Sequence, residues 1–266
     1  MNEESVLHPG LIVPVGHVEP VARRIRGEID GRVVFDTRRA LYVWEWPAYP
    51  QFSIPAEDLV GGVLIDDDHA EERGAWPARR HSLHVGSQVR EGAAWVWDDG
   101  APEPLRGTVR FEWEALDAWF EEDEPVFVHP RSPYSRVDAL RSSSSVRVEV
   151  DGVVLVDAPY CVKLFETGLP TRYYVDRLHV DLTRLRPSET VTSCPYKGTT
   201  SGYWSFDSEV ATHEDIAWAY DFPTAHAQRI AGLIAFYNEH VDLYVDGTLL
   251  PRSTERPQAG ASGPAR

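Results

Sequence analysis

The sequence predicts a mainly β protein, a β-rich α+β chain in which two tandem copies of one module each contain little helix. The first observation is an internal repeat. A shift of 121 residues aligns "IDGRVVFDTRRALYVWE" (29–45) with "VDGVVLVDAPYCVKLFE" (150–166). Farther along, "AAWVWD" (93–98) resembles "IAWAYD" (216–221), and "LRGTVRF" (105–111) resembles "IAGLIAF" (230–236). Because the matching blocks keep the same order, they indicate an internal duplication.

The second observation is strand patterning. "VRVEVDGVVLVD" alternates apolar and polar residues around Asp151-Gly152, which predicts a β-hairpin. "CVKLFE", "YWSF", "IAWAY" and "VDLYV" are short β-rich runs broken by Gly, Pro or acidic residues. Thr224 is a candidate N-cap of one short helix that Gly232 closes. A second short helix is predicted over 113–120, as an insertion found only in the first copy.

These patterns divide the chain into five parts. They are a flexible N-terminus (1–19), a first module (20–130), a linker (131–145), a second module (146–250) and a disordered tail (251–266). The linker is rich in Ser and contains Pro, and the tail is rich in Pro, Ser and Gly.

Composition restricts the function. The formal net charge of -16 argues against a nucleic-acid or anionic-membrane partner, because phosphate binding needs a basic face. No run reaches the length of a membrane span, and the acidic N-terminus lacks a signal pattern, so we expect a cytoplasmic protein. Cys161 and Cys194 form no CxxC pair, and no metal site or other cofactor is predicted.

Several motifs carry a family resemblance. "FETGLPTRYY", "CPYKGTTSGYW", "AWAYDFP" and "IAGLIAFYNE" resemble domain-of-unknown-function family 427, which has a nucleotidyltransferase-like catalogue name. The resemblance covers the second copy and extends more loosely over the first. It implies two β-tent modules, a fold shared with the ligand-binding domain of cereblon. Many β-tent relatives hold zinc through two CxxC pairs, which this chain lacks.

The first copy departs from the motif. "AWPARR" (75–80) stands opposite "SCPYKG", with Trp76 in place of Cys194, although Glu45 remains opposite Glu166. The thiol and the lysine are therefore absent from the first copy. Two alternatives follow: the first copy is structural, or it binds a different molecule with its tryptophans.

Cys194 and Lys197 follow a predicted strand and lie in a turn made by Pro195 and Gly198, a rigid position from which to present side chains. Lys163 and Lys197 are the only lysines beside 24 arginines, which favours a specific role for an amine. A nearby ammonium would favour a reactive thiolate. Alternatively, Cys194 is a small buried apolar residue and Lys197 binds backbone carbonyls.

Glu166 ends a predicted strand, where it is either an acid, base or anchor facing Lys197 or a structural acceptor for the following loop. Arg172 suits a carboxylate or phosphate group of a ligand, or a surface ion pair. Because adjacent strand residues face opposite ways, at most one of Tyr173 and Tyr174 shares a pocket with Arg172. The remaining candidates are aromatic and form either core or an aromatic cage; they are Tyr196, Tyr203, Trp204, Trp218 and Tyr220.

Three functions fit these residues. The first is an enzyme or binder for a small metabolite in the second copy, where Lys197 and Arg172 hold an anionic or carbonyl group and Glu166 moves a proton. Lysine-assisted acid/base or carbonyl chemistry would suit such an enzyme. The second is a non-catalytic aromatic cage for a modified base, a nucleoside or a peptide end. The third is nucleotidyl transfer, for which the sequence lacks the GxxxxGK, GxGxxG and Asp-x-Asp motifs.

Overall fold

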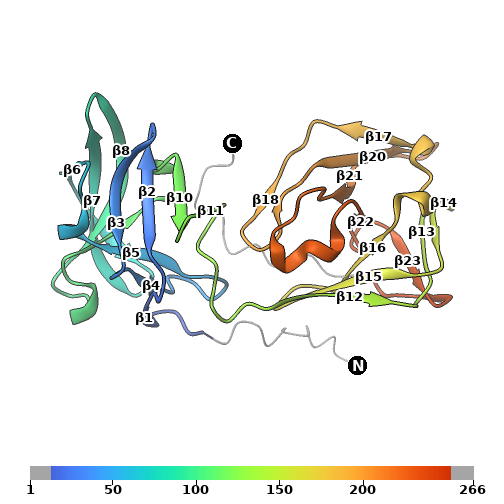
Figure 1. Cartoon of the computed structure of the whole chain (residues 1–266), viewed down its shortest axis with the longest axis horizontal. Coiled ribbons are helices and arrows are strands. Elements are labelled where there is room, and N and C mark those ends of the chain that lie inside the picture. The colour runs from blue at the N-terminus through green and yellow to red at the C-terminus, as the bar shows by residue number, and fades with distance from the viewer. Residues whose placement is uncertain (1–12, 253–266) are drawn as a thin grey trace. The chain divides into compact units, whose positions relative to one another are not determined.

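The computed structural model describes residues 13–252 and divides the chain into two compact units, Pro9–Tyr134 and a unit that begins at Ser135 (Figure 1). Both units are mainly antiparallel β-sheet. The described helices are short 3-10 helices: η1 (Ala56–Asp58), η2 (Glu103–Leu105), η3 (Trp113–Ala115), η4 (Arg177–His179), η5 (Leu182–Arg184) and η6 (Ala225–Ile230). None of the helices within residues 13–252 has the length and apolar character needed to cross a membrane.

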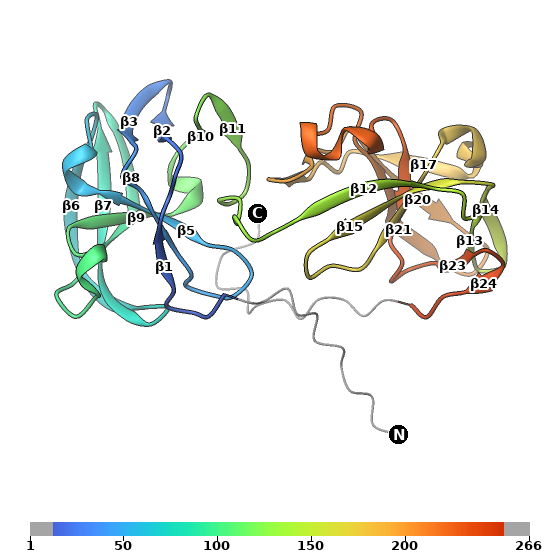
Figure 2. The ribbon, with the colours of Figure 1, turned by 60° about the horizontal axis from the view of Figure 1, so that its bottom comes forward.

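The N-terminal unit packs two sheets face to face (Figure 2). The larger sheet runs in the order β1 (Val18–Pro20), β4 (Leu41–Val43), β5 (Gln51–Pro55), β9 (Thr108–Phe111), β8 (Gln88–Trp97), β7 (Trp76–Val85) and β6 (Val63–Arg73). The smaller runs in the order β11 (Glu124–Val126), β10 (Ala118–Glu121), β2 (Ile25–Ile29) and β3 (Arg32–Thr37).

The C-terminal unit repeats this arrangement. Its larger sheet runs in the order β12 (Val137–Ser142), β15 (Cys161–Glu166), β16 (Arg172–Val175), β22 (Ile234–Phe236), β21 (Thr212–Ala219), β20 (Gly202–Asp207) and β17 (Leu185–Ser188). The smaller has the order β14 (Val153–Ala158), β13 (Val146–Val150), β23 (Asp242–Val245) and β24 (Thr248–Leu249). A two-stranded hairpin, β18 (Ser193–Cys194) and β19 (Gly198–Thr199), is added.

Corresponding strands occupy corresponding places in the two units, so the predicted duplication and the mainly β class are confirmed. The predicted Asp-Gly hairpin is present between β13 and β14, where Val150 pairs with Val153. Asp151 and Gly152 have φ of 50° and 76°, the left-handed values that a two-residue type I′ turn requires. Asp30-Gly31 forms the equivalent turn in the N-terminal unit, with φ of 49° and 68°.

The larger sheet of the C-terminal unit is covered on both faces. One face packs on the smaller sheet through residues such as Val148, Leu155 and Ile216. The opposite face carries Tyr174, Trp218 and other aromatic side chains, and η6 packs on it through buried Ala227 and Ile230. Because both faces are buried, the strands carry apolar or aromatic residues at successive positions and lack simple alternation.

The predicted helix over 113–120 is wrong. Only η3 is helical, and Ala118–Glu121 is strand β10, which pairs with β2 and corresponds to β23 of the C-terminal unit. It is therefore no insertion. Trp119 and Glu121 point inward on this strand, so the apolar residues follow a period of two where we expected a helical face.

Two predicted boundaries also need correction. Residues 137–142 of the predicted linker form β12, which pairs with β15 along its whole length. Residues 18 and 19 of the predicted flexible N-terminus belong to β1, which pairs with β4. Most of the predicted tail, 253–266, lies outside the described residues. The short helix after Thr224 is present as η6, although the Thr224 side chain makes no capping hydrogen bond.

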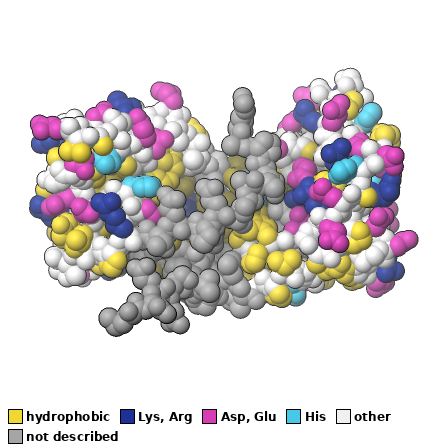
Figure 3. Space-filling model, turned by 180° about the vertical axis from the view of Figure 1, so that it is seen from behind, with side chains coloured by type: hydrophobic (Ala, Val, Ile, Leu, Met, Phe, Trp, Pro, Cys, Tyr) yellow, Lys and Arg dark blue, Asp and Glu magenta, His cyan; other side chains and the backbone are white. Residues whose placement is uncertain are grey.

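Acidic side chains are spread over both units and are interspersed with basic ones on the face in Figure 3. Many of them form ion pairs, such as Arg186 with Asp207 and Arg147 with Glu149. These exposed pairs contribute little to stability individually, but they reduce repulsion in a chain with a net charge of -16.

Gly61 allows the closest backbone approach in the N-terminal unit. A Cβ atom at this position would lie 2.1 Å from the carbonyl oxygen of Val33. We expect Gly61→Ala to lower the free energy of unfolding by about 2 kcal/mol, because the backbone must move to relieve the overlap. Chemical denaturation measures the effect. Val60→Ala, at the neighbouring residue that is 70% exposed, is the control; an equal loss for both would contradict the steric argument.

Candidate functional site

Lys197 and Glu166 form an ion pair at one end of the larger C-terminal sheet. Glu166 is the last residue of β15, and Lys197 is presented by the turn between β18 and β19. Their side chains are only 12% and 10% exposed. The Cys-Pro-Tyr-Lys-Gly turn therefore places the ammonium group of Lys197 beside the buried carboxylate of Glu166.

The turn is held by hydrogen bonds to the segment before η6. The Thr224 backbone N–H donates to the Lys197 carbonyl at 3.1 Å, and the Thr224 hydroxyl donates to the Tyr196 carbonyl. Within the turn, the Lys197 N–H donates to the Cys194 carbonyl at 3.3 Å. The hydroxyl of Thr224 thus holds the lysine turn, which explains why it does not cap η6.

The environment keeps Lys197 protonated. Burial alone would lower the pKa of the ammonium group, but attraction to Glu166 outweighs burial, and the pKa lies above its ordinary value. A protonated amine donates hydrogen bonds and cannot attack a carbonyl. At neutral pH, Lys197 is therefore suited to donate hydrogen bonds and to supply a positive charge. It is not suited to act as a nucleophile.

Four aromatic residues named by the sequence share the sheet face with this pair: Tyr174, Tyr203, Trp218 and Tyr220. All are buried, and Tyr174 is 0% exposed. The Trp218 indole N–H donates to the Tyr174 hydroxyl at 3.1 Å. Burial raises the pKa of Tyr174 to about 12, and burial likewise raises the pKa of Tyr220. These hydroxyls are consequently neutral donors at physiological pH.

A second ion pair lies on the same face. The Arg172 guanidinium donates to Glu239 with both terminal nitrogens, at 2.6 and 2.8 Å. It lies over the rings of Trp218 and Tyr237, 5.7 and 5.4 Å from their centroids. Burial tends to raise the pKa of the Glu239 carboxyl, but the bonds to Arg172 outweigh it and lower the pKa. Glu239 is therefore ionised at neutral pH.

Tyr237 and Glu239 were not among the predicted site residues, although "IAGLIAFYNE" contains both. The Tyr237 ring lies 4.3 Å from that of Trp218, and its hydroxyl is 3.3 Å from that of Tyr203. Thr192, also not predicted, is 2.8 Å from the Tyr203 hydroxyl. The signal for Glu239 was faint, because a carboxylate three residues after a strand is common on any acidic surface.

The structure does not bring all the predicted residues together. Tyr173 and Trp204 pack on the opposite face of the sheet, against the core beneath the smaller sheet. Cys194 is a free, half-buried cysteine in β18, and the Tyr196 side chain is also half-buried. We use the term polar-aromatic face for the set that does converge: Glu166, Arg172, Tyr174, Lys197, Tyr203, Trp218, Tyr220, Tyr237 and Glu239.

The N-terminal unit keeps the carboxylate but changes its cation. Glu45 corresponds to Glu166, and its partner is Arg110 of β9 at 3.0 Å. Ala235 stands at the position of Arg110 in the C-terminal unit, since Trp95 pairs with Arg110 and Trp218 with Ala235. The N-terminal unit has thus replaced a lysine on a turn by an arginine on a strand.

Trp95, the counterpart of Trp218, lies in a charged setting. Its indole N–H donates to Glu112 at 2.7 Å, and the Arg73 guanidinium lies 4.1 Å from its ring centroid. Glu112 also pairs with Arg73 and Arg110. Where the C-terminal unit has tyrosine hydroxyls, this unit has ion pairs, so the two faces differ in charge and in hydrogen-bonding groups.

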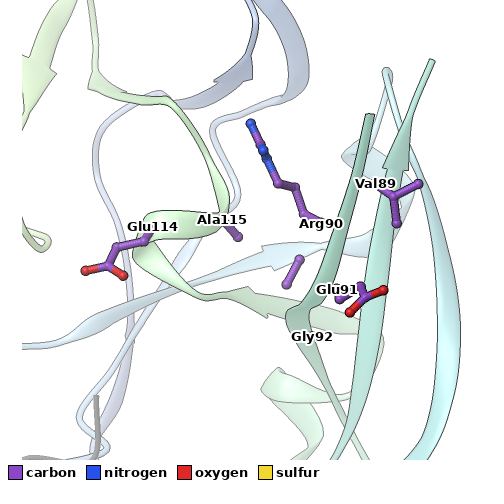
Figure 4. Close-up of a pocket in the computed structure, with 7 residues that line it drawn as sticks. Val89, Arg90, Glu91, Gly92, Glu114 and Ala115 are labelled. Carbon is purple, nitrogen blue, oxygen red and sulfur yellow. The ribbon is translucent and has the colours of Figure 1, made fainter. Parts of the chain in front are cut away.

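Two ligand-sized cavities within residues 13–252 lie elsewhere. One, of about 510 Å³, is in the N-terminal unit (Figure 4), and one, of about 290 Å³, is in the C-terminal unit. Of the polar-aromatic face, only Glu239 lines the second cavity. Within the described part of the chain, no group of three or more His, Cys, Asp or Glu side chains has an arrangement that could hold a metal ion.

Comparison with known families now gives these features a context. Residues 17–122 and 138–247 each match the family described as a domain of unknown function, DUF427, with the model name NTP_transf_9. The chain belongs to this family and contains two tandem copies of its domain. A search of curated proteins found no match.

Proposed function

We propose that the C-terminal unit binds a small, polar, planar molecule at the polar-aromatic face. The observation that carries this proposal is the buried Lys197–Glu166 pair, held by a rigid turn beside Tyr174, Trp218 and Tyr220. Burying an ion pair costs desolvation energy that well-packed apolar residues would avoid. Stability alone does not require this buried pair, whereas a role in ligand recognition explains why its desolvation cost is retained.

Charge balance favours an uncharged or zwitterionic ligand. The face contains two cations, Lys197 and Arg172, and each is neutralised by its own carboxylate, Glu166 or Glu239. A phosphate group would have to displace one of these carboxylates. This balance supports a heterocycle with carbonyl and N–H groups over a nucleoside triphosphate, and it weighs against nucleotidyl transfer.

Hydrogen-bond chemistry points the same way. Lys197 and the neutral tyrosine hydroxyls supply donors, while Glu166 supplies an acceptor, so one carbonyl and one N–H of a planar ring can both be satisfied. The half-buried Tyr237 provides aromatic surface for stacking, and the buried ring of Trp218 packs behind it. Arg172 and Tyr237 keep partial exposure, which makes them the rim of the face.

Binding without turnover is the simpler function for this geometry. Lys197 is held in its charged form, so a Schiff base with a carbonyl substrate would first require loss of a proton against the attraction of Glu166. The protonated amine can polarise a carbonyl group instead. We therefore propose that this unit is a binding module. Catalytic turnover of a bound compound would contradict this proposal.

A thermal-shift panel tests the proposal. The probes are nucleobases, nucleosides, carbonyl acids and ATP with Mg²⁺, each added to wild type, Lys197→Arg and Lys163→Arg. We expect an uncharged heterocycle to raise the Tm of wild type by several degrees, because ligand at 100 times its Kd adds about 2.7 kcal/mol. Lys197→Arg should lose this shift.

Lys163→Arg is the matched control, because the other lysine of the chain lies on the opposite side of β15 and bonds Ser144 at 3.0 Å. Trp218→Phe and Trp204→Phe form a second matched pair on the two faces of the sheet. A Tm shift caused only by ATP with Mg²⁺, or one that survives in Lys197→Arg, would refute the proposed site.

A further inference from the structure

The hairpin that carries Lys197 is detached from the sheets around it. Its strands, β18 and β19, have two residues each and pair only with each other among the strands of residues 13–252. Thr192 and Thr200 close the base of this lysine hairpin (residues 192–200), where the Thr200 N–H donates to the Thr192 carbonyl at 2.9 Å. In Figure 1, β18 lies beyond the ends of β17 and β20. A two-stranded hairpin is at best marginally stable alone, so contacts with the rest of the unit must hold it.

The corresponding hairpin of the N-terminal unit is part of its larger sheet. Trp218 is the counterpart of Trp95, and the same offset sets the turn at Gly74 opposite Lys197. β6 and β7 remain paired up to this turn, and β7 also pairs with β8. In the C-terminal unit, by contrast, neither β17 nor β20 reaches the lysine hairpin. Strand pairing therefore fixes the hairpin of the N-terminal unit but leaves the lysine hairpin free to move as one piece.

Polar contacts hold the lysine hairpin against the unit. Lys197 pairs with Glu166, and Thr224 bonds carbonyl groups of the turn. None of the hairpin's residues belongs to the buried apolar cluster on the polar-aromatic face. η6 is anchored in that cluster by Ala227 and Ile230, which are both 0% exposed. The lysine hairpin can thus leave its place by exchanging polar contacts, whereas movement of η6 would expose apolar side chains.

The tyrosine hydroxyls of the face are covered. Tyr174, Tyr203 and Tyr220 are 0%, 4% and 4% exposed, respectively. The lysine hairpin lies close to two of them. The Thr192 hydroxyl oxygen is 2.8 Å from that of Tyr203, and the charge of Lys197 tends to lower the pKa of Tyr174, although burial outweighs it. A ligand therefore reaches these hydroxyls only when an element that covers them moves.

We propose that the lysine hairpin is a lid, which opens to admit a ligand to the polar-aromatic face and then closes over it. Its role in ligand entry rests on the function proposed for that face. With the lid closed and no ligand bound, Lys197 and Glu166 satisfy each other. A carbonyl and an N–H group of a planar ring can replace this pairing without leaving either charge unsatisfied. The ion pair that recognises the ligand is thus also the latch of the lid.

The chain on either side of the hairpin is fixed to β21. Before the hairpin, the Thr190 hydroxyl donates to Asp215 at 2.6 Å, and after it, the Ser201 N–H donates to the Ala219 carbonyl at 2.9 Å. Val191, which is 67% exposed, lies between the first of these fixed points and the hairpin. The motion is therefore confined to the lysine hairpin, with Val191 and the peptide link before Ser201 as its hinges.

Amide hydrogen exchange of the full-length chain, followed by NMR at neutral pH, tests the lid without a ligand. The Thr224 N–H loses its acceptor, the Lys197 carbonyl, when the lid opens, whereas the Ala227 N–H keeps its bond within η6. After correction for intrinsic rates, we expect Thr224 to exchange about 100-fold faster than Ala227. The Trp218 indole N–H, which is buried on the same face, should exchange through the same opening as Thr224.

Thr224→Val removes one hydrogen bond to the turn and leaves the polar-aromatic face intact. It should speed exchange of the residue 224 amide and of the Trp218 indole about fivefold each, with no change at Ala227. Thr199→Val is the matched control. The Thr199 hydroxyl contacts only the Ser193 hydroxyl, at 2.9 Å within the hairpin, so its loss should leave the opening rate of the lid unchanged.

Three results would each overturn the lid. They are exchange of Thr224 as slow as that of Ala227, exchange of Thr224 that the Trp218 indole does not follow, and equal rates in wild type and Thr224→Val. Failure of the lid is distinguishable from failure of the proposed function. The exchange experiment contains no ligand and reports only the opening, whereas the thermal-shift panel reports only binding.

Discussion

Replacing Lys197 with methionine is expected to lower the free energy of unfolding by about 3–5 kcal/mol, because it leaves the Glu166 carboxylate buried without its counter-charge. Lys197→Met with Glu166→Gln should recover most of this loss, since no charge is then buried. Urea denaturation of the three proteins measures both effects. Lys163→Met, at the half-buried lysine that bonds Ser144, should cost about 0.5 kcal/mol.

The same pair predicts a pH dependence. The folded-state pKa of Lys197 lies above the unfolded value of about 10.4, so the stability that the pair contributes is fully present below that pH. It is lost as pH rises through the folded-state pKa. The difference between wild type and Lys197→Met should therefore be constant from about pH 6 to about pH 9. A difference that vanishes within this range would contradict the pairing.

Arg110→Met is expected to have an effect of similar size in the N-terminal unit. The Arg110 side chain is 8% exposed and pairs with Glu45 and Glu112. Its removal leaves the buried Glu45 carboxylate without this partner, while Glu112 keeps its pair with Arg73. We expect a loss of about 3–5 kcal/mol by urea denaturation at neutral pH. Exposed Arg136, which pairs with Asp138, gives the control Arg136→Met with a loss below about 1 kcal/mol.

At acid pH, the difference in the free energy of unfolding between wild type and Arg110→Met should become smaller. Burial alone would raise the pKa of the Glu112 carboxyl, but attraction to Arg110 outweighs it and lowers the pKa. The stability from this interaction is present above the unfolded value of about 4.3 and is lost as pH falls through the folded-state pKa. A difference that stays constant below about pH 4 would show that Arg110 acts through packing alone.

Local patterns in the sequence predicted the architecture well. The Asp-Gly pairs specify tight turns by themselves. Because the sequence repeats, each strand or turn predicted in one copy was also predicted in the other. The segment 113–120 failed because Trp113, Leu116 and Phe120 match a helical face, while the alternation of Trp119 and Glu121 is too short to outweigh it. Only pairing with β2, whose paired residues lie 90 or more positions earlier, decides between the two.

The candidate site was predictable in part. Glu166 and Lys197 were considered together because both stand in motif positions, and the structure pairs them. The exchange of cation between the units was not visible, because Arg110 lies on strand β9, Lys197 lies on a turn, and Arg110 aligns with Ala235. The cavities were equally hidden, since each is lined by residues from separate segments of the chain.

Each unit has a β-bulge with one residue in the left-handed region, at Gly92 and at Asp215, and this feature constrains how the two copies diverged. A positive φ is readily tolerated by glycine and, among other residues, mainly by asparagine and aspartate. Gly92 and Asp215 both belong to this small set. Codons for glycine and aspartate can differ by a single base, so one nucleotide change exchanges these two residues without passing through a strained intermediate. The bulge residue can thus change from an uncharged to an acidic side chain while the backbone of the strand keeps its conformation.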